Sequence, residues 1–254
     1  MIITIRKSTL IISIIIIVLL LSVIPLLGER VLVTSGVNRR LPIYSVQTQE
    51  KKIAISFDAA WGDEYTLQIL DILDKYNVKT TFFLVGFWVD KYPSHVKEMN
   101  VRGHEIGNHS STHPHMTQLS KEQMAKELNS TGDKIMAITE KKPNLFRPPF
   151  GDYNNILIET AEENGYYTIQ WDVDSLDWKK IGSIQIVDRV VRNVKNGSII
   201  LFHNNSEYVL EYLPLVLEKL RSEGYKIVPI GELIYKENYY MDHTGKQCKK
   251  SNEK

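Results

Sequence analysis

Side chains capable of acid–base chemistry and metal binding stand at the ends of several short apolar segments of this chain. They are Asp58, His109, His113, Arg147, Asp174, Asp177 and His203. Aspartate and histidine are common general bases and acids, and neutral imidazole is a common ligand of divalent cations. An arginine can hold a carboxylate in a fixed geometry. This combination of residue types predicts a site that moves protons and binds a metal.

Two of the motifs have informative spacing. His109 and His113 are four residues apart, and on one helical turn they would lie on the same face and share a cation. Arg147 opens the sequence Arg-Pro-Pro-Phe-Gly, in which the prolines restrict the backbone and Gly151 permits a tight turn. Such a rigid loop can hold a guanidinium against a carboxylate and aim a backbone N–H at a developing oxyanion.

The elements that must position these residues alternate between strands and helices. We expect strands at 53–57, 80–84, 104–106, 145–146, 167–171, 198–202 and 225–228. Helical patterns fall between them at 65–76, 94–100, 120–138, 154–164, 184–194 and 209–222. This alternation predicts an α/β fold with a parallel sheet, open or closed into a barrel. The reactive residues follow strands, and the carboxyl ends of parallel strands meet at one edge, where catalytic groups gather.

The N-terminus predicts a membrane segment. Arg6 and Lys7 precede the run 8–27, which has no charged residue and is long enough to cross a bilayer of about 30 Å. The basic flank predicts a cytoplasmic N-terminus and an exported body, hence a cell-membrane location. A cleaved signal peptide, giving a secreted protein, is the alternative. We therefore divide the chain into an anchor at 1–28, a tether at 29–50, a catalytic domain at 51–236 and a polar tail at 237–254, disordered from about Asp242.

Composition narrows the function classes. The net charge is +1, with 31 basic and 30 acidic residues, so the chain lacks the basic excess typical of a nucleic-acid binder. The single cysteine, Cys248, excludes an intrachain disulfide framework and a thiolate metal cluster. The sequence indicates no particular protein partner.

Five motifs in order resemble those of the polysaccharide deacetylases, the carbohydrate esterases that share the chitooligosaccharide-deacetylase homology domain. The resemblance spans roughly 52–234 and rests on Asp58, His109-Ser-x-x-His113, Arg147-Pro-Pro-Phe-Gly151, Asp174-Ser-Leu-Asp177-Trp178 and Leu201-Phe-His203. The first motif, Phe57-Asp-Ala-Ala-Trp-Gly-Asp63, looks most like the branch associated with sporulation.

The resemblance implies a distorted (β/α) barrel of about seven parallel strands. It also implies a divalent metal, zinc or alternatively cobalt, that serves the hydrolysis of N-acetyl groups on a cell-wall polysaccharide. Peptidoglycan amino sugars are the first expected substrate and chitin-like oligomers the second. The resemblance implies that Asp58 is the general base, oriented by Arg147, and that His203 is the general acid, paired with Asp177. It implies that His109 and His113 are metal ligands and that the backbone N–H of Phe150 binds the oxyanion. Trp178 and Leu201 would form the walls of the acetyl pocket.

One position departs from the family pattern. Members usually carry a second aspartate, a metal ligand, where this chain has Ala59, and two histidines fall short of the three protein ligands usual for catalytic zinc. Asp63 could swing in as a replacement ligand, or a water could fill the position and leave a weaker site. The alternative is a catalytically degenerate protein that binds cell-wall glycan without hydrolysing it. A small-molecule deacylase is a third possibility.

Overall fold

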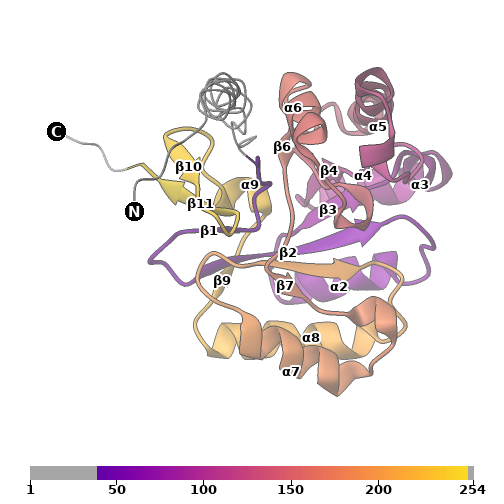
Figure 1. Cartoon of the computed structure of the whole chain (residues 1–254). Helices are drawn as coiled ribbons and strands as arrows, with labels where there is room; N and C mark the ends of the chain where they lie inside the picture. Colours follow the sequence, from indigo (N-terminus) through magenta and orange to yellow (C-terminus); the bar gives the residue numbers. More distant parts are fainter. Residues whose placement is uncertain (1–38, 251–254) are drawn as a thin grey trace, which may run out of the picture. The chain divides into compact units, whose positions relative to one another are not determined.

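A parallel sheet of seven strands positions the site, in the spatial order β6-β5-β4-β3-β2-β8-β7 (Figure 1). A computed structural model of the chain describes residues 39–250. The seven strands are β2 (Lys52–Ala59), β3 (Thr81–Leu84), β4 (Glu105–Asn108), β5 (Leu145–Phe146), β6 (Tyr167–Thr168), β7 (Val173–Asp174) and β8 (Ile199–His203). An eighth short strand, β9 (Lys226–Ile227), pairs with the start of β2. The predicted α/β class and the number of parallel strands are confirmed.

Strand β2 is the centre of the sheet. Its residues after Lys52 are all buried, as its apolar sequence predicts for a strand covered on both faces. It pairs in parallel with β3 on one side and β8 on the other, and this register sets Asp58 beside His203. The two strands are far apart in the sequence, so the pairing of β2 with β8 brings two candidate catalytic residues together.

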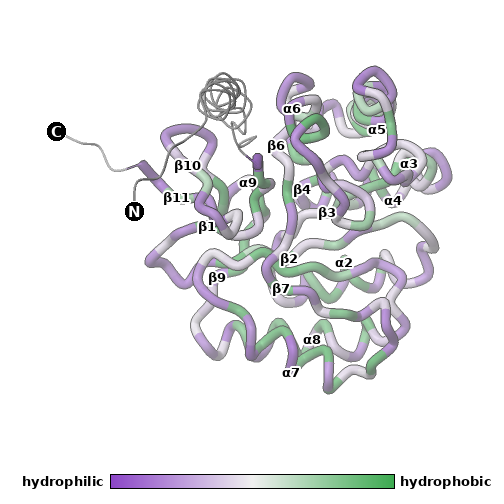
Figure 2. Tube along the Cα trace, viewed as in Figure 1, coloured by the Kyte–Doolittle hydropathy of each residue, from purple (hydrophilic) through white to green (hydrophobic). Residues whose placement is uncertain are grey.

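Helices cover the sheet. They are α2 (Thr66–Lys75), α3 (Gly86–Lys91), α4 (Pro93–Val101), α5 (Lys121–Thr139), α6 (Asn155–Glu163), α7 (Ser183–Asn193), α8 (Val209–Ser222) and α9 (Ile230–Leu233). Figure 2 shows green and purple residues alternating along α7 and α8, as expected for helices that bury one face. A capping box begins α5: Ser120 and Gln123, three residues apart in the sequence, satisfy each other's backbone N–H groups.

The segment before β2 bridges from the end of β6 to the start of β8. Strands β6 and β7 are not hydrogen-bonded to each other, but Ile43 forms a bridge to Ile169 and Ser45 forms one to Ser198. This segment contains the short strand β1 (Ser45–Val46). The predicted tether is therefore part of the folded unit from Arg40 onward, and the sheet is a distorted, incompletely paired barrel.

The predicted disorder of the C-terminal tail from about Asp242 is wrong for residues 242–249. Strands β10 (Tyr239–Met241) and β11 (Lys246–Lys249) form a hairpin, and β11 also pairs in parallel with β1. Cys248 is consequently buried rather than exposed. The tail is polar in sequence, but the edge of β1 gives its backbone N–H and C=O groups partners that no local pattern indicates.

Other differences are local. Helix α3 was not predicted, because its six residues follow β3 directly and their apolar run resembles a continued strand. The predicted strand 167–171 is shorter: pairing with β5 ends at Thr168, and Ile43 then exchanges backbone hydrogen bonds with Thr168 and Gln170. The predicted anchor at 8–27 lies outside the described residues. No helix within 39–250 is long and apolar enough to cross a membrane.

Candidate active site

The carboxyl ends of the strands surround a pocket of about 550 Å³. Eight of the predicted site residues line it: Asp58, His109, His113, Phe150, Asp174, Trp178, Leu201 and His203. Arg147 and Asp177 lie behind this lining and are buried, with 0% and 1% of their surfaces exposed. The structure thus gathers residues from five strand ends around one cavity, the arrangement expected for parallel strands.

Asp58 and Arg147 form a buried ion pair. Arg147 Nη1 donates to Asp58 Oδ1 at 2.7 Å, while Nη2 donates to the carbonyl of Gln170 at 3.2 Å. Burial by itself raises the pKa of Asp58, but the charges of Arg147, His109 and His203 outweigh burial and hold that pKa below its ordinary value. Asp58 is therefore ionised at neutral pH, as a general base must be.

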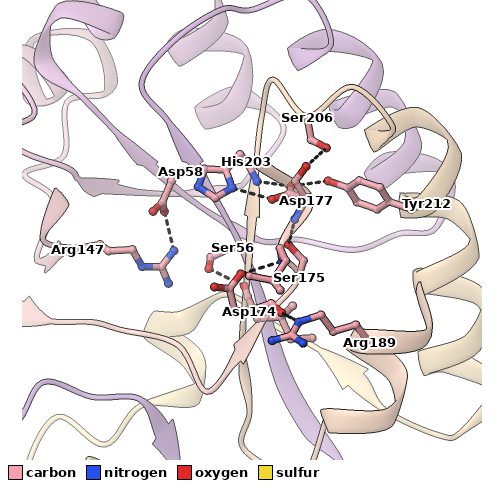
Figure 3. A network of polar contacts seen from close by, with 12 residues as sticks. Ser56, Asp58, Arg147, Asp174, Ser175, Asp177, Arg189, His203, Ser206 and Tyr212 are labelled. Carbon is pink, nitrogen blue, oxygen red and sulfur yellow. Dashed lines mark hydrogen bonds and ion pairs between the residues drawn. The ribbon is translucent and has the colours of Figure 1, made fainter. Parts of the chain in front are cut away.

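His203 is held by the carboxylate of Asp177. The Nδ1 atom of His203 lies 2.8 Å from Asp177 Oδ1, so Nδ1 carries the hydrogen and Nε2 is available to the pocket. Burial lowers the pKa of His203, but the hydrogen bond and charge of Asp177 outweigh it and raise the pKa above its ordinary value. Figure 3 shows His203 lying between Asp58 and Asp177. An ionised base and a readily protonated imidazole thus stand side by side at the pocket.

Tyr212, which the sequence did not single out, completes the support of Asp177. Its hydroxyl donates to Asp177 Oδ2 at 2.7 Å, and the backbone N–H of His203 donates to the same oxygen at 2.8 Å (Figure 3). The Tyr212 ring is buried and stacks on Phe202. In sequence Tyr212 is one apolar position of the amphipathic helix α8, so nothing local distinguishes it from a core residue.

The two histidines meet through a loop, and the prediction that they share a helical turn is wrong. His113 has a φ of 57°, and its ring centroid lies 5.0 Å from that of His109. Glu127 on α5 holds the loop by accepting hydrogen bonds from the backbone N–H groups of Ser111 and Thr112 at 2.7 and 2.8 Å. Those bonds satisfy backbone groups that a helical turn would otherwise have paired.

Each imidazole keeps a nitrogen free for a ligand. His109 Nδ1 lies 2.7 Å from the carbonyl of Arg147, so it carries the hydrogen, and Nε2 faces Asp58 Oδ2 at 3.6 Å. His113 Nδ1 is buried without a hydrogen-bond partner. Burial, reinforced by the charge of His109, lowers the pKa of His113 to about 4. Both rings are neutral at pH 7, as metal ligands must be.

The residues present do not complete a three-ligand zinc site. Ala59 is buried and presents only a methyl group. The Asp63 carboxylate lies 3.5 Å from His95 Nδ1 and is absent from the pocket lining, so this structure does not support Asp63 as the replacement ligand. Within 39–250, no group of three or more histidine, cysteine or acidic side chains is arranged to hold a metal ion. Two imidazoles alone are a weak site for zinc.

Phe150 and the acetyl-pocket candidates lie at the rim or in the wall of the cavity. Phe150 has a φ of 61°, and the Gln170 side chain donates to the next carbonyl, that of Gly151, at 3.0 Å. Trp178 is exposed, whereas Leu201 on β8 is buried. Their positions are compatible with the roles that the family resemblance implies.

Comparison with known proteins identifies the family. The polysaccharide deacetylase family model matches residues 45–169. A peptidoglycan-N-acetylglucosamine deacetylase of Bacillus cereus is 38% identical over 196 residues, which are 75% of this chain and 92% of the relative. The peptidoglycan-N-acetylmuramic acid deacetylase PdaA of Bacillus subtilis is 34% identical over 196 residues, covering 76% and 74%. The chain belongs to the polysaccharide deacetylase family, which confirms the predicted family and class of enzyme.

A solved structure adds a contrasting relative. A Bacillus anthracis protein described as a CE4 family pseudoenzyme superposes with a TM-score of 0.73 and 37% identity, covering 76% of this chain and 68% of its own. A mutant of that protein, described as having restored enzymatic activity, gives the same TM-score at 38% identity, covering 76% and 70%. The fold of this chain is thus shared by deacetylases and by at least one member described as inactive.

Proposed function

We propose that this protein removes N-acetyl groups from amino sugars of a cell-wall glycan, with peptidoglycan as the first expected substrate and chitin-like oligomers as the second. The observation that carries the proposal is the pairing of β2 with β8. It sets an ionised aspartate, Asp58, beside an imidazole, His203, whose pKa is raised. Amide hydrolysis needs a base for the attacking water and an acid for the poor amine leaving group.

The proposed steps use residues of the chain. Asp58, oriented by Arg147, accepts a proton from the attacking water. His203 donates its Nε2 proton to the departing amine while Asp177 balances the imidazolium charge. The backbone N–H of Phe150 stabilises the oxyanion, and Trp178 and Leu201 receive the acetyl methyl group.

A divalent metal would be held by the two histidines of the pocket. Deacetylases of this family are generally metal-dependent, and a bound divalent cation polarises a carbonyl and lowers the pKa of water. The chain offers His109 and His113 but no third ligand at position 59. We therefore expect Zn²⁺ or Co²⁺ to bind more weakly here than at a three-ligand site.

A second candidate function is glycan binding without hydrolysis. The substitution at Ala59 favours it, and so does the likeness to a solved pseudoenzyme. The buried Asp58–Arg147 pair and the Asp177–His203 pair favour hydrolysis, because a binding protein has no chemical need for a matched base and acid. The membrane anchor, the extracytoplasmic location and the link to sporulation remain parts of the proposal that rest on the sequence alone.

Acetate release tests the proposal. The full chain and its Ala59→Asp variant would be incubated with N-acetylated peptidoglycan fragments and chitin oligomers, with zinc, cobalt or a chelator. Release by the native chain is the expected result, and its loss with the chelator would establish metal dependence. Release by the variant alone would favour the glycan-binding function for the native chain. Absence of release by both, with folded protein, would refute deacetylation.

A further inference from the structure

We propose that Trp61 and Phe87 form a second sugar subsite, which stacks against a neighbouring pyranose ring of a glycan strand. The inference rests on the proposed glycan substrate and extends it, because such a subsite makes the protein select oligomers over single sugars. It does not depend on hydrolysis, and it applies equally if the chain only binds glycan.

The two rings form a continuous surface that leads out of the pocket. Trp61 lines the pocket, and its ring centroid lies 6.1 Å from that of Phe87 at the start of α3. Trp61 is 58% exposed and Phe87 is 36% exposed. On its inner side Trp61 contacts the ring of His113 edge to face, with centroids 4.8 Å apart. Trp61 thus connects the pocket to Phe87, which lies outside the pocket lining.

The backbone holds both rings in place. The carbonyl of Gly62 accepts hydrogen bonds from Trp88 Nε1 at 2.7 Å and from Asn204 Nδ2 at 3.0 Å. Gly62 has a φ of 69°, a left-handed backbone conformation that glycine adopts without strain. On the other ring, the N–H of Phe87 donates to the carbonyl of Ser111 at 3.2 Å. A preordered surface loses little conformational entropy when a ligand binds.

The chemistry around the rings favours a carbohydrate. An exposed aromatic face offers an apolar contact to the C–H groups of a pyranose, whose hydroxyls require polar neighbours. The side chain of Asn205, which lines the same pocket as Trp61, provides such a polar neighbour. A protein or lipid partner would require a wider apolar patch than two adjacent rings. Because the two rings adjoin the proposed acetyl-sugar pocket, the ligand that they bind is the next sugar of the same glycan strand.

Calorimetric titration of the full chain with N-acetylglucosamine oligomers of increasing length tests the subsite. A chelator would be present to limit turnover, and acetate would be measured in the same samples. We expect native affinity to rise with length beyond the single sugar. Phe87→Ala should lower the affinity for the longer oligomers by about tenfold, the order of magnitude expected for the loss of one aromatic contact, without changing binding of the monosaccharide. Trp61→Ala should lower oligomer affinity at least as much.

Tyr240→Ala is the matched control, because Tyr240 is an exposed aromatic residue on the separate β1-β11-β10 sheet. Three outcomes would each overturn the subsite. The native chain and Phe87→Ala could bind the oligomers with equal affinity, Tyr240→Ala could lose as much affinity as Phe87→Ala, or the native chain could bind no oligomer. Aromatic-dependent binding without acetate release would instead refute the proposed hydrolysis and leave the subsite intact. Acetate release with unchanged oligomer affinity in Phe87→Ala would refute the subsite and leave the proposed hydrolysis intact.

Discussion

Replacing Tyr212 by phenylalanine removes one hydrogen-bond donor from the buried Asp177, together with the hydroxyl's hydrogen bond with Ser206. The phenyl ring keeps the stacked contact with Phe202, at a centroid distance of 5.2 Å. Asp177 Oδ2 would retain only the backbone N–H of His203, and no water can replace the lost hydroxyl at a residue that is 1% exposed. A hydrogen bond to a charged group contributes about 1.5–3 kcal/mol. For a domain of this size, that loss lowers the Tm by about 3–12 °C.

The same change should raise the pKa of His203. Tyr212 donates to the carboxylate of Asp177, and this bond is stronger when His203 is neutral, because the negative charge is then uncompensated. Losing the donor therefore destabilises the neutral form of His203 more than the protonated form. The proposed general acid works protonated, so activity falls as the pH rises through its pKa. In Tyr212→Phe this fall should move to higher pH.

Two assays examine the reasoning, and neither requires activity. Calorimetry measures the change in Tm, and an NMR titration of the His203 ring, assigned with the His203→Gln variant, measures its pKa. Tyr208→Phe is the control, since Tyr208 caps the start of the same helix and gives no hydrogen bond to Asp177. An unchanged Tm together with an unchanged or lowered His203 pKa in Tyr212→Phe would refute the assigned role of the hydroxyl.

Three further predictions follow from the buried pair, the missing ligand and the N-terminal strand. Asp58→Asn should abolish acetate release and lower the free energy of unfolding in urea by about 3–5 kcal/mol, because it leaves the Arg147 charge buried without its partner. Adding Arg147→Met to this variant should restore part of the lost stability. If the double variant is no more stable, the pairing argument is contradicted. Ala59→Asp should tighten zinc binding measured by calorimetry, and unchanged affinity would indicate a remodelled pocket. A chain starting at Thr48 lacks β1 and should have a Tm well below that of a chain starting at Arg39, because each buried apolar side chain lost contributes about 1.5–3 kcal/mol. Equal Tm values would show that β1 adds nothing to the stability of the domain.

Several features of the fold could be read from local sequence. The apolar strand expected at 53–57 lies within the longer β2, and the capping box of Ser120 and Gln123 and the boundaries of α8 fall where the patterns place them. Each depends on interactions within a few residues, such as side-chain periodicity or a cap three residues away. The pattern of strands followed by reactive residues was also sufficient to place Asp58 and His203 at one edge of one sheet.

Other features depend on contacts between distant segments. The hairpin of β10 and β11 forms against β1, the loop of His109 and His113 is held by Glu127, and Asp63 faces His95. A polar tail becomes strand when an edge offers its backbone partners, and a histidine pair leaves the helical path when a carboxylate satisfies its N–H groups. None of these partners can be recognised from its own neighbours in the sequence.

The sequence by itself determined the family, the alternation of strands and helices, and the residue types that meet at the pocket, including the alanine where a metal ligand is expected. Only the tertiary structure decided that Tyr212 supports Asp177 across a separation of 35 residues, that Asp63 does not replace the missing ligand, and that Trp61 and Phe87 form one surface. The physical reason is that strand and helix periodicity act locally, whereas hydrogen-bond partners, burial and the pKa values they produce arise from which distant segments pack together.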